Sequence, residues 1–150
     1  MSNEANASRP LIGRESTAVP GHFGEPLSVE YSVTSRGGFD QHPTHPLFLC
    51  LHGWGSSEED MAGIMRLIAP YNDFVALRGP LALAKAPERS EMPGNYAWLH
   101  DALPVGDDLD YDAYAAATAV DRWVAANIPA DRDVVPLGFS QGGLVAVHLL

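Results

Sequence analysis

The chain has 150 residues, of which 46% are hydrophobic, so it is long enough for one ordinary domain with its own core. Its formal net charge is −10 and Lys85 is the only lysine, which argues against nucleic-acid partners and anionic membrane surfaces, because both require clustered positive charge. The first residues do not resemble a signal peptide and no stretch approaches the ~20 apolar residues of a membrane span, so we expect a cytoplasmic protein.

The chain opens with a stretch that lacks any periodic pattern. Residues 1–25 mix Ser, Asn, Glu, Gly and Pro, and we expect them to form a flexible leader before a domain at 26–150. The following stretch, LSVEYSVTS, alternates apolar and polar residues from Leu27 to Ser35. That pattern predicts an outer strand with one solvent-exposed face.

Two short apolar runs follow, Leu47 to Leu51 and Phe74 to Leu77, and they are typical of parallel strands covered on both faces. Between them, SSEEDMAGIMRLIAP predicts an amphipathic helix that ends before Pro70, with Ser56 and Glu59 placed as a capping box. Its apolar stripe has helical spacing: Met61, Ile64, Met65 and Ile68. The first run contains the sole cysteine, Cys50, which excludes an internal disulfide and predicts a buried, inert thiol.

A second helix is predicted from Asp110, as its cap, to Ile128. Its expected buried stripe consists of Ala113, Ala117, Val120 and Val124. The Pro- and Gly-rich loop at 79–106 is a candidate pocket wall. The strand DVVPLG comes next, where Pro136 requires an irregularity or a position facing an unpaired side. This alternation predicts an α/β fold with a mostly parallel sheet and flanking helices.

Ser140 lies in the string GFSQGG, which has the spacing G-x-S-x-G. A serine becomes a nucleophile when a sharp strand-to-helix turn exposes it, and Gly138 and Gly142 remove side chains that would collide at that turn. Gly143 adds room for the helix to approach the sheet. Gln141 begins the helix, so its backbone N–H is predicted to form half of an oxyanion hole.

The other half is predicted in LHGWG, directly after the first buried strand. Gly53 and Gly55 permit a tight turn, and the N–H of Trp54 is the expected second donor. His52 is expected to hold this loop by hydrogen bonding. A metal or organic cofactor is not expected in this chemistry.

The strings LFLCLHGWGSSEEDM, NYAWLHDA and LGFSQGG, in that order, resemble the carboxylesterase and acyl-protein thioesterase branch of the α/β-hydrolase superfamily, also called phospholipase/carboxylesterase. The resemblance covers the chain from about Leu27 to its end. It implies Ser140 as the nucleophile, Gln141 and Trp54 as amide donors, and Trp98 in a pocket for the acyl or leaving group. The substrate would be a small-molecule or acyl ester, or a thioester.

The family places its catalytic acid and histidine after two further strands, both downstream of the nucleophile. The resemblance therefore implies that this chain carries the N-terminal part of the domain, with half a site. Among the histidines present, His148 lies eight residues beyond Ser140, ~12 Å along a helix, and is expected to pack there. His100 remains open as a surrogate base.

Two functions remain open on this evidence. One is a serine esterase, and the other is a non-catalytic remnant that binds ester-like ligands or serves as an assembly piece. The strand before Ser140 would have an open edge, so we expect the isolated chain to aggregate, to dimerise through that edge, or to be marginally folded.

Overall fold

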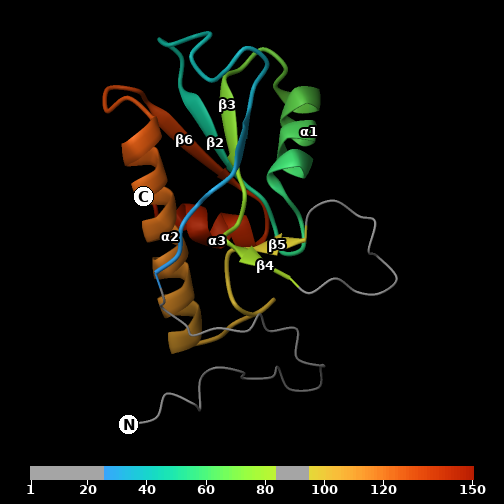
Figure 1. The fold of residues 1–150 in the computed structure, drawn as a ribbon, viewed down its shortest axis with the longest axis vertical. Coiled ribbons are helices and arrows are strands. Elements are labelled where there is room, and N and C mark those ends of the chain that lie inside the picture. Colours follow the sequence, from blue (N-terminus) through green and yellow to red (C-terminus); the bar gives the residue numbers. More distant parts are fainter. Residues whose placement is uncertain (1–25, 84–94) are drawn as a thin grey trace.

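The computed structural model describes residues 26–83 and 95–150, and the predicted leader lies outside this range. A four-stranded sheet forms its centre, in the order β1-β3-β2-β6 (Figure 1). The strands are β1 (Ser32–Thr34), β2 (Leu47–Leu51), β3 (Phe74–Leu77) and β6 (Val134–Gly138). β2, β3 and β6 are parallel, whereas β1 is antiparallel to β3.

Helices cover both faces of this sheet (Figure 1). They are α1 (Glu58–Ile68), α2 (Asp107–Asn127) and α3 (Gln141–Val147). Alternate residues of β2 point to opposite faces, so Cys50 packs with α1 whereas Leu49 and Leu51 pack with α2 and α3. The mostly parallel sheet with flanking helices confirms the fold class predicted from the sequence.

The start of α1 differs by one residue from the prediction. Ser57 is the N-cap, and its hydroxyl oxygen accepts a 3.3 Å hydrogen bond from the N–H of Asp60. Ser56 instead donates to the Asp60 carboxylate at 2.9 Å, so the predicted capping box of Ser56 and Glu59 is wrong. The Ser56 hydroxyl, which was expected to cap the helix, is thus bound to the Asp60 side chain.

The buried face of α1 is also rotated from the predicted stripe. Met61, Ala62 and Met65 are buried, whereas Ile64 is 42% exposed and Ile68 67% exposed. The small Ala62 side chain lets the helix approach the sheet on that side, which turns Ile64 away. Ile68 lies in the last turn, before the cap at Ala69.

The start of α2 was also predicted wrongly. The helix begins at Asp107 with Gly106 as N-cap, and Asp110 lies in its first turn. Gly106 has a φ of +58°, a conformation that glycine adopts without strain, and carboxylates in a first turn interact favourably with the helix dipole. The expected buried stripe is found: Ala113, Ala117 and Val120 are buried and Val124 is partly buried.

Two segments refine the remaining predictions. β1 is an outer strand, as expected, but it pairs with β3 only over Ser32–Thr34. The predicted loop at 79–106 contains a small antiparallel sheet of β4 (Leu81–Ala82) and β5 (Tyr96–Ala97). Within the described part of the chain, no helix is both long and apolar enough to cross a membrane.

Pro136 lies in the middle of β6, which is at the edge of the sheet. The N–H of Leu47 donates to Asp133, and the N–H of Phe139 donates to Leu51. Because successive backbone groups of a strand point to opposite sides, the odd-numbered positions of β6 face β2 and Pro136 faces the open side. Its missing N–H therefore costs no hydrogen bond in this sheet.

Candidate active site

Ser140 stands at the sharp turn between β6 and α3. Its backbone has φ +53° and ψ −116°, and it is the one non-glycine residue with positive φ among residues 26–83 and 95–150. The residue is exposed. A non-glycine residue in this region stores backbone strain of about 1–3 kcal/mol, which the surrounding structure must offset.

The glycines around Ser140 permit close approach of the backbone. A Cβ at Gly138 would lie 2.3 Å from the carbonyl oxygen of Gly142, and one at Gly142 would lie 2.1 Å from that of Leu51. Neither position can hold a side chain without moving the backbone. At Gly143 the nearest atom would be 3.6 Å away, an ordinary contact, so this glycine is not required for space.

The loop after β2 packs directly against this turn. A Cβ at Gly53 would lie 3.4 Å from the Cβ of Ser140 and 3.3 Å from the carbonyl oxygen of Phe139. Gly55 has a φ of +75°, and its N–H donates to Tyr96 at 2.9 Å. Trp54, between these two glycines, is thereby brought to the Ser140 end of the sheet.

Two backbone N–H groups next to the serine have no hydrogen-bond acceptor within the described part of the chain. They belong to Trp54 and Gln141. The N–H of Gly142 donates to Phe139 and that of Gly143 donates to Ser140, so the first turn of α3 uses its other donors internally. Both unpaired amides belong to the loops that meet at Ser140, and they are available to a carbonyl oxygen.

His52 is completely buried and holds the base of the Trp54 loop. Its Nε2 accepts a 2.8 Å hydrogen bond from the N–H of Gly79, so Nδ1 carries the proton and donates to the carbonyl oxygen of Gly53 at 2.7 Å. Burial lowers the pKa of His52 below its usual value, which keeps the ring neutral. A ring with both nitrogens engaged is a structural support.

The side chain of Gln141 fastens a third segment to the site. Its Oε1 accepts hydrogen bonds from the N–H groups of Trp98 and Leu99, at 2.8 and 3.1 Å, and its Nε2 donates to Asp101 at 3.2 Å. The residue is buried. Gln141 therefore holds the 98–101 segment while its own backbone N–H remains unpaired.

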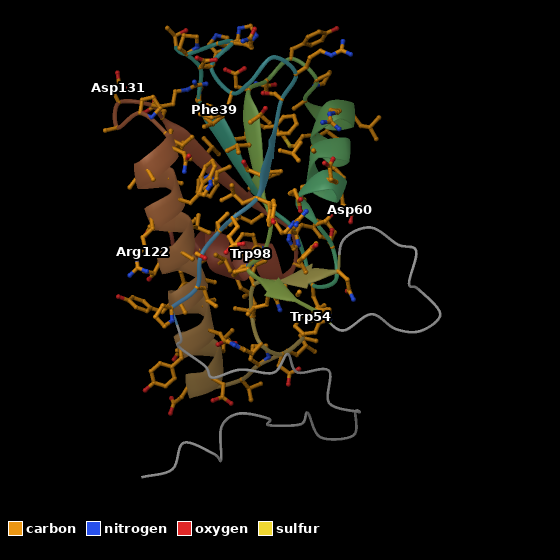
Figure 2. All side chains as sticks on the ribbon, viewed as in Figure 1. Phe39, Trp54, Asp60, Trp98, Arg122 and Asp131 are labelled. Carbon is orange, nitrogen blue, oxygen red and sulfur yellow. The ribbon has the colours of Figure 1, made fainter. Side chains whose placement is uncertain are left out.

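Trp98 is fully buried, and its indole N–H donates to the carbonyl oxygen of His52 at 2.9 Å. Figure 2 shows it inside the molecule, with Trp54 nearer the end that carries β4 and β5. In this structure Trp98 supports the loop after β2 through this hydrogen bond. Its predicted place in a substrate pocket stays a prediction.

The other histidines lie away from the Ser140 hydroxyl or are engaged elsewhere. His100 is buried, with Nδ1 2.8 Å from the Asp112 carboxylate, which also accepts the backbone N–H of His100. His148 is exposed and caps α3, where its Nδ1 donates to Leu144, so the expectation that it packs inside is wrong. The ring of His148 turns back to a carbonyl group of its own helix, which keeps it at the surface.

Nucleophilic or metal chemistry at other groups finds little support in the described residues. The Cys50 thiol is buried, which raises its pKa to about 12 and leaves it protonated. Over the described ranges, no three His, Cys, Asp or Glu side chains are grouped as metal ligands.

Sequence reasoning missed the side-chain role of Gln141 and the buried pair of His100 and Asp112. Neither has a local sequence signal, because the partners are separated by 40 and 12 positions in the chain. It also missed Arg78, whose guanidinium pairs with the buried carboxylate of Glu58. Glu58 is one of three consecutive acidic residues at the start of α1, a pattern typical of solvent-exposed side chains.

Comparison with known proteins places these features in a family. A family model described as phospholipase/carboxylesterase matches residues 39–150. The crystal structure of esterase PE8 is similar, with a TM-score of 0.51 and 21% identity, over 83% of this chain and 57% of that chain. The structure of a phospholipase/carboxylesterase from Dyadobacter fermentans DSM 18053 gives a TM-score of 0.46 and 20% identity, over 85% and 56%. No curated protein matches significantly.

The likeness to esterase PE8 shows the fold, and the chain spans little more than half the length of that protein. The family match covers most of the chain, including the loop after β2 and the turn at Ser140. The chain therefore belongs to the phospholipase/carboxylesterase family of α/β hydrolases.

Proposed function

We propose that this chain carries the nucleophile and the oxyanion-binding groups of a serine esterase. The observation that supports it is the strained, exposed Ser140 with the unpaired N–H groups of Gln141 and Trp54 on the two loops that meet there. Donors fixed in this way stabilise charge that develops only in the transition state, and each contributes ~3 kcal/mol.

The proposed reaction proceeds in two steps. The Ser140 Oγ attacks the carbonyl carbon of a carboxylic ester or thioester, its proton passes to a general base, and the two amides hold the oxyanion. The bond to the leaving oxygen or sulfur then breaks, and the alcohol or thiol departs with a proton. Water attacks the acyl-enzyme in the same way, which releases the carboxylic acid and restores the serine.

The base for this reaction is not among the contacts of Ser140. In the described part of the chain, no histidine nitrogen hydrogen-bonds the Ser140 hydroxyl, and His52 and His100 are bound to other groups. We infer that the histidine and acid lie in sequence beyond that given, as the family resemblance implies. The 150-residue chain by itself should then turn over esters near background rates, because oxyanion stabilisation and binding alone remain.

A fluorophosphonate probe tests the nucleophile. Labelling at Ser140 is expected in any longer product of the same gene, with loss of labelling in Ser140→Ala. Ser32→Ala, a change at an exposed serine on β1, at the opposite edge of the sheet from β6, is the matched control and should label normally. Labelling that persists in Ser140→Ala would remove Ser140 from the mechanism.

The second candidate is a non-catalytic chain that binds ester-like ligands or serves as an assembly piece. It is favoured by the open edge of β6 and by the engagement of both nitrogens of the His52 ring. The reading frame after codon 150 discriminates the two: an open frame that encodes Asp and His on later loops supports the enzyme, and a stop codon supports the binding chain. Cytoplasmic location stays a prediction, and so does hydrolysis of thioesters alongside carboxylic esters.

A further inference from the structure

A hollow of about 470 Å³ opens where β3 ends, separate from the turn at Ser140. Its walls come from three parts of the chain: the segment before β1, the residues from the end of β3 through β4, and β5. Leu27, Pro80 and Ala82 supply apolar surface, and Arg78 supplies a charged group. None of these residues has a role in the mechanism proposed above.

Arg78 is held rigidly in this hollow. Its guanidinium carbon lies 4.2 Å from the ring centre of Tyr31 and 4.4 Å from that of Tyr96, so the two rings cover it. The Glu58 carboxylate receives hydrogen bonds from Nε at 2.9 Å and from Nη2 at 2.5 Å, and Glu58 is buried. These contacts leave the Arg78 side chain 26% exposed.

The guanidinium retains donors that no described residue uses. A guanidinium has five N–H groups, and Glu58 occupies those of Nε and one of Nη2. Within residues 26–83 and 95–150, no other acceptor contacts the Arg78 side chain. The remaining N–H groups, on Nη1 and Nη2, form a fixed edge whose donors can converge on one ligand oxygen.

The charges around Arg78 decide what kind of oxygen this edge favours. The Glu58 carboxylate neutralises the guanidinium at contact distance, and Glu30 contributes a further carboxylate to the wall of the hollow. The whole chain is also strongly acidic. An anionic ligand would meet net negative charge, whereas an uncharged carbonyl oxygen gains the hydrogen bonds without that repulsion.

The hollow lies at the same end of the sheet as Ser140. Leu77 is in register with Leu51, and Leu51 with Gly138, so the residues that follow the three strands are level with one another. Arg78 is thus two strand spacings, roughly 10 Å, from the residues that lead into the nucleophile turn. One ester molecule of moderate size can span that separation.

We propose that this hollow is a subsite for an uncharged ligand group that combines a carbonyl oxygen, as in an amide or ester, with a small apolar body. Arg78 donates to the oxygen, and the apolar wall receives the body. Naming this group as the part of an ester substrate remote from the scissile bond rests on the proposed function. The proposal that the hollow binds such a group does not depend on the proposed function.

Three probes of similar size and different charge test the subsite: benzamide, benzoate and benzylamine. Dissociation constants are measured by NMR titration of the complete chain, following the Arg78 Nε–H and the Gly79 amide. Benzamide is expected to shift both signals and to bind several-fold more tightly than benzoate or benzylamine. Failure of benzamide to shift them, or tighter binding of either charged probe, would overturn the proposal.

Two pairs of variants locate the site and separate its charge from that of the whole chain. Ala82→Trp and Ser28→Trp, at exposed lining positions from different segments of the chain, should each weaken benzamide binding at least tenfold in a folded protein. Glu30→Gln should reduce the ratio of the benzoate to the benzamide dissociation constant several-fold. Asp121→Asn, which removes the same charge from the exposed side of α2, should leave that ratio unchanged. Equal effects of Glu30→Gln and Asp121→Asn would contradict the local role of Glu30.

Binding and catalysis fail separately in this design. Ser140→Ala should leave benzamide affinity unchanged, because the hollow does not include the turn. A chain that binds benzamide but never labels with fluorophosphonate would keep the subsite and lose the esterase. A chain that labels at Ser140 without binding benzamide would keep the esterase and lose the subsite.

Discussion

The indole N–H of Trp98 donates a 2.9 Å hydrogen bond to the carbonyl oxygen of His52, a residue 46 positions earlier in the chain. Both residues are fully buried, and their rings lie 5.5 Å apart. This bond fixes the segment after β5 against the end of β2. The loop that presents Trp54 therefore depends on a tryptophan outside that loop.

Trp98→Phe should lower the free energy of unfolding by about 1–3 kcal/mol, because the buried carbonyl of His52 loses its partner. Urea denaturation followed by circular dichroism measures the change. Trp123→Phe is the control, since Trp123 is only partly buried at the edge of the core. A loss at Trp98 no greater than that at Trp123 would show that the hydrogen bond does not hold the loop.

Gly142 and Gly143 are adjacent, and substitution by alanine should affect them oppositely. A Cβ at Gly142 would meet the Leu51 carbonyl oxygen at 2.1 Å, so Gly142→Ala should cost about 3 kcal/mol or prevent folding. Gly143→Ala meets nothing closer than 3.6 Å, and a helical alanine gains up to about 1 kcal/mol over glycine. Thermal melts of the two variants compare them directly, and equal destabilisation would contradict the predicted close contact.

Stability should fall as the pH drops below the ordinary histidine range, because of His52. Burial lowers its pKa in the folded protein below 6.5, so the unfolded chain binds the proton first. The contribution of His52 is complete above pH 6.5 and decreases between that pH and the lower folded-state pKa. Urea midpoints measured from pH 8 to 5 should show a shallower slope for His52→Gln than for the parent chain.

His148→Gln is the control for this pH dependence, because His148 is exposed. Its slope should match that of the parent chain. A parent slope unchanged by His52→Gln would mean that another group causes the acid sensitivity.

The open side of β6 should promote self-association. Apolar side chains remain uncovered on β6, on α3 and just after each of them: Val135, Phe139, Leu144, Val147 and Leu150 are 40–97% exposed. Leu144→Lys with Val147→Lys should reduce the sedimentation coefficient at high protein concentration, because charge opposes the burial of this surface. Leu67→Lys, on α1 and 84% exposed, is the control and should not. A parent chain that sediments as a monomer would contradict the prediction.

The sequence predicted the strands and helices that place Ser140, because each carries a strong local signal. The apolar runs of β2 and β3 allow few alternatives, and a serine between glycines after a strand defines the turn. Helix starts were less predictable. Ser56 and Ser57 are equally suitable caps by type, and the choice between them depends on where the Asp60 carboxylate settles.

The parts that could not be predicted are contacts between distant segments. The amide of Gln141 satisfies backbone groups of the 98–101 segment, and Arg78 is fixed by Glu58 and by two tyrosines, one just before β1 and one in β5. Glutamine and arginine occur at many exposed positions, so residue type alone indicates no burial or partner. Only the folded arrangement shows which of these side chains are enclosed.

Pro136 has a consequence for any strand that adds to the free side of β6. That strand would meet carbonyl groups along the edge but no N–H at Pro136, so the ladder would lack one rung near its centre. Amides next to the missing rung should exchange with solvent faster than those between β2 and β3. An enlarged sheet would then separate first between β6 and the added strand.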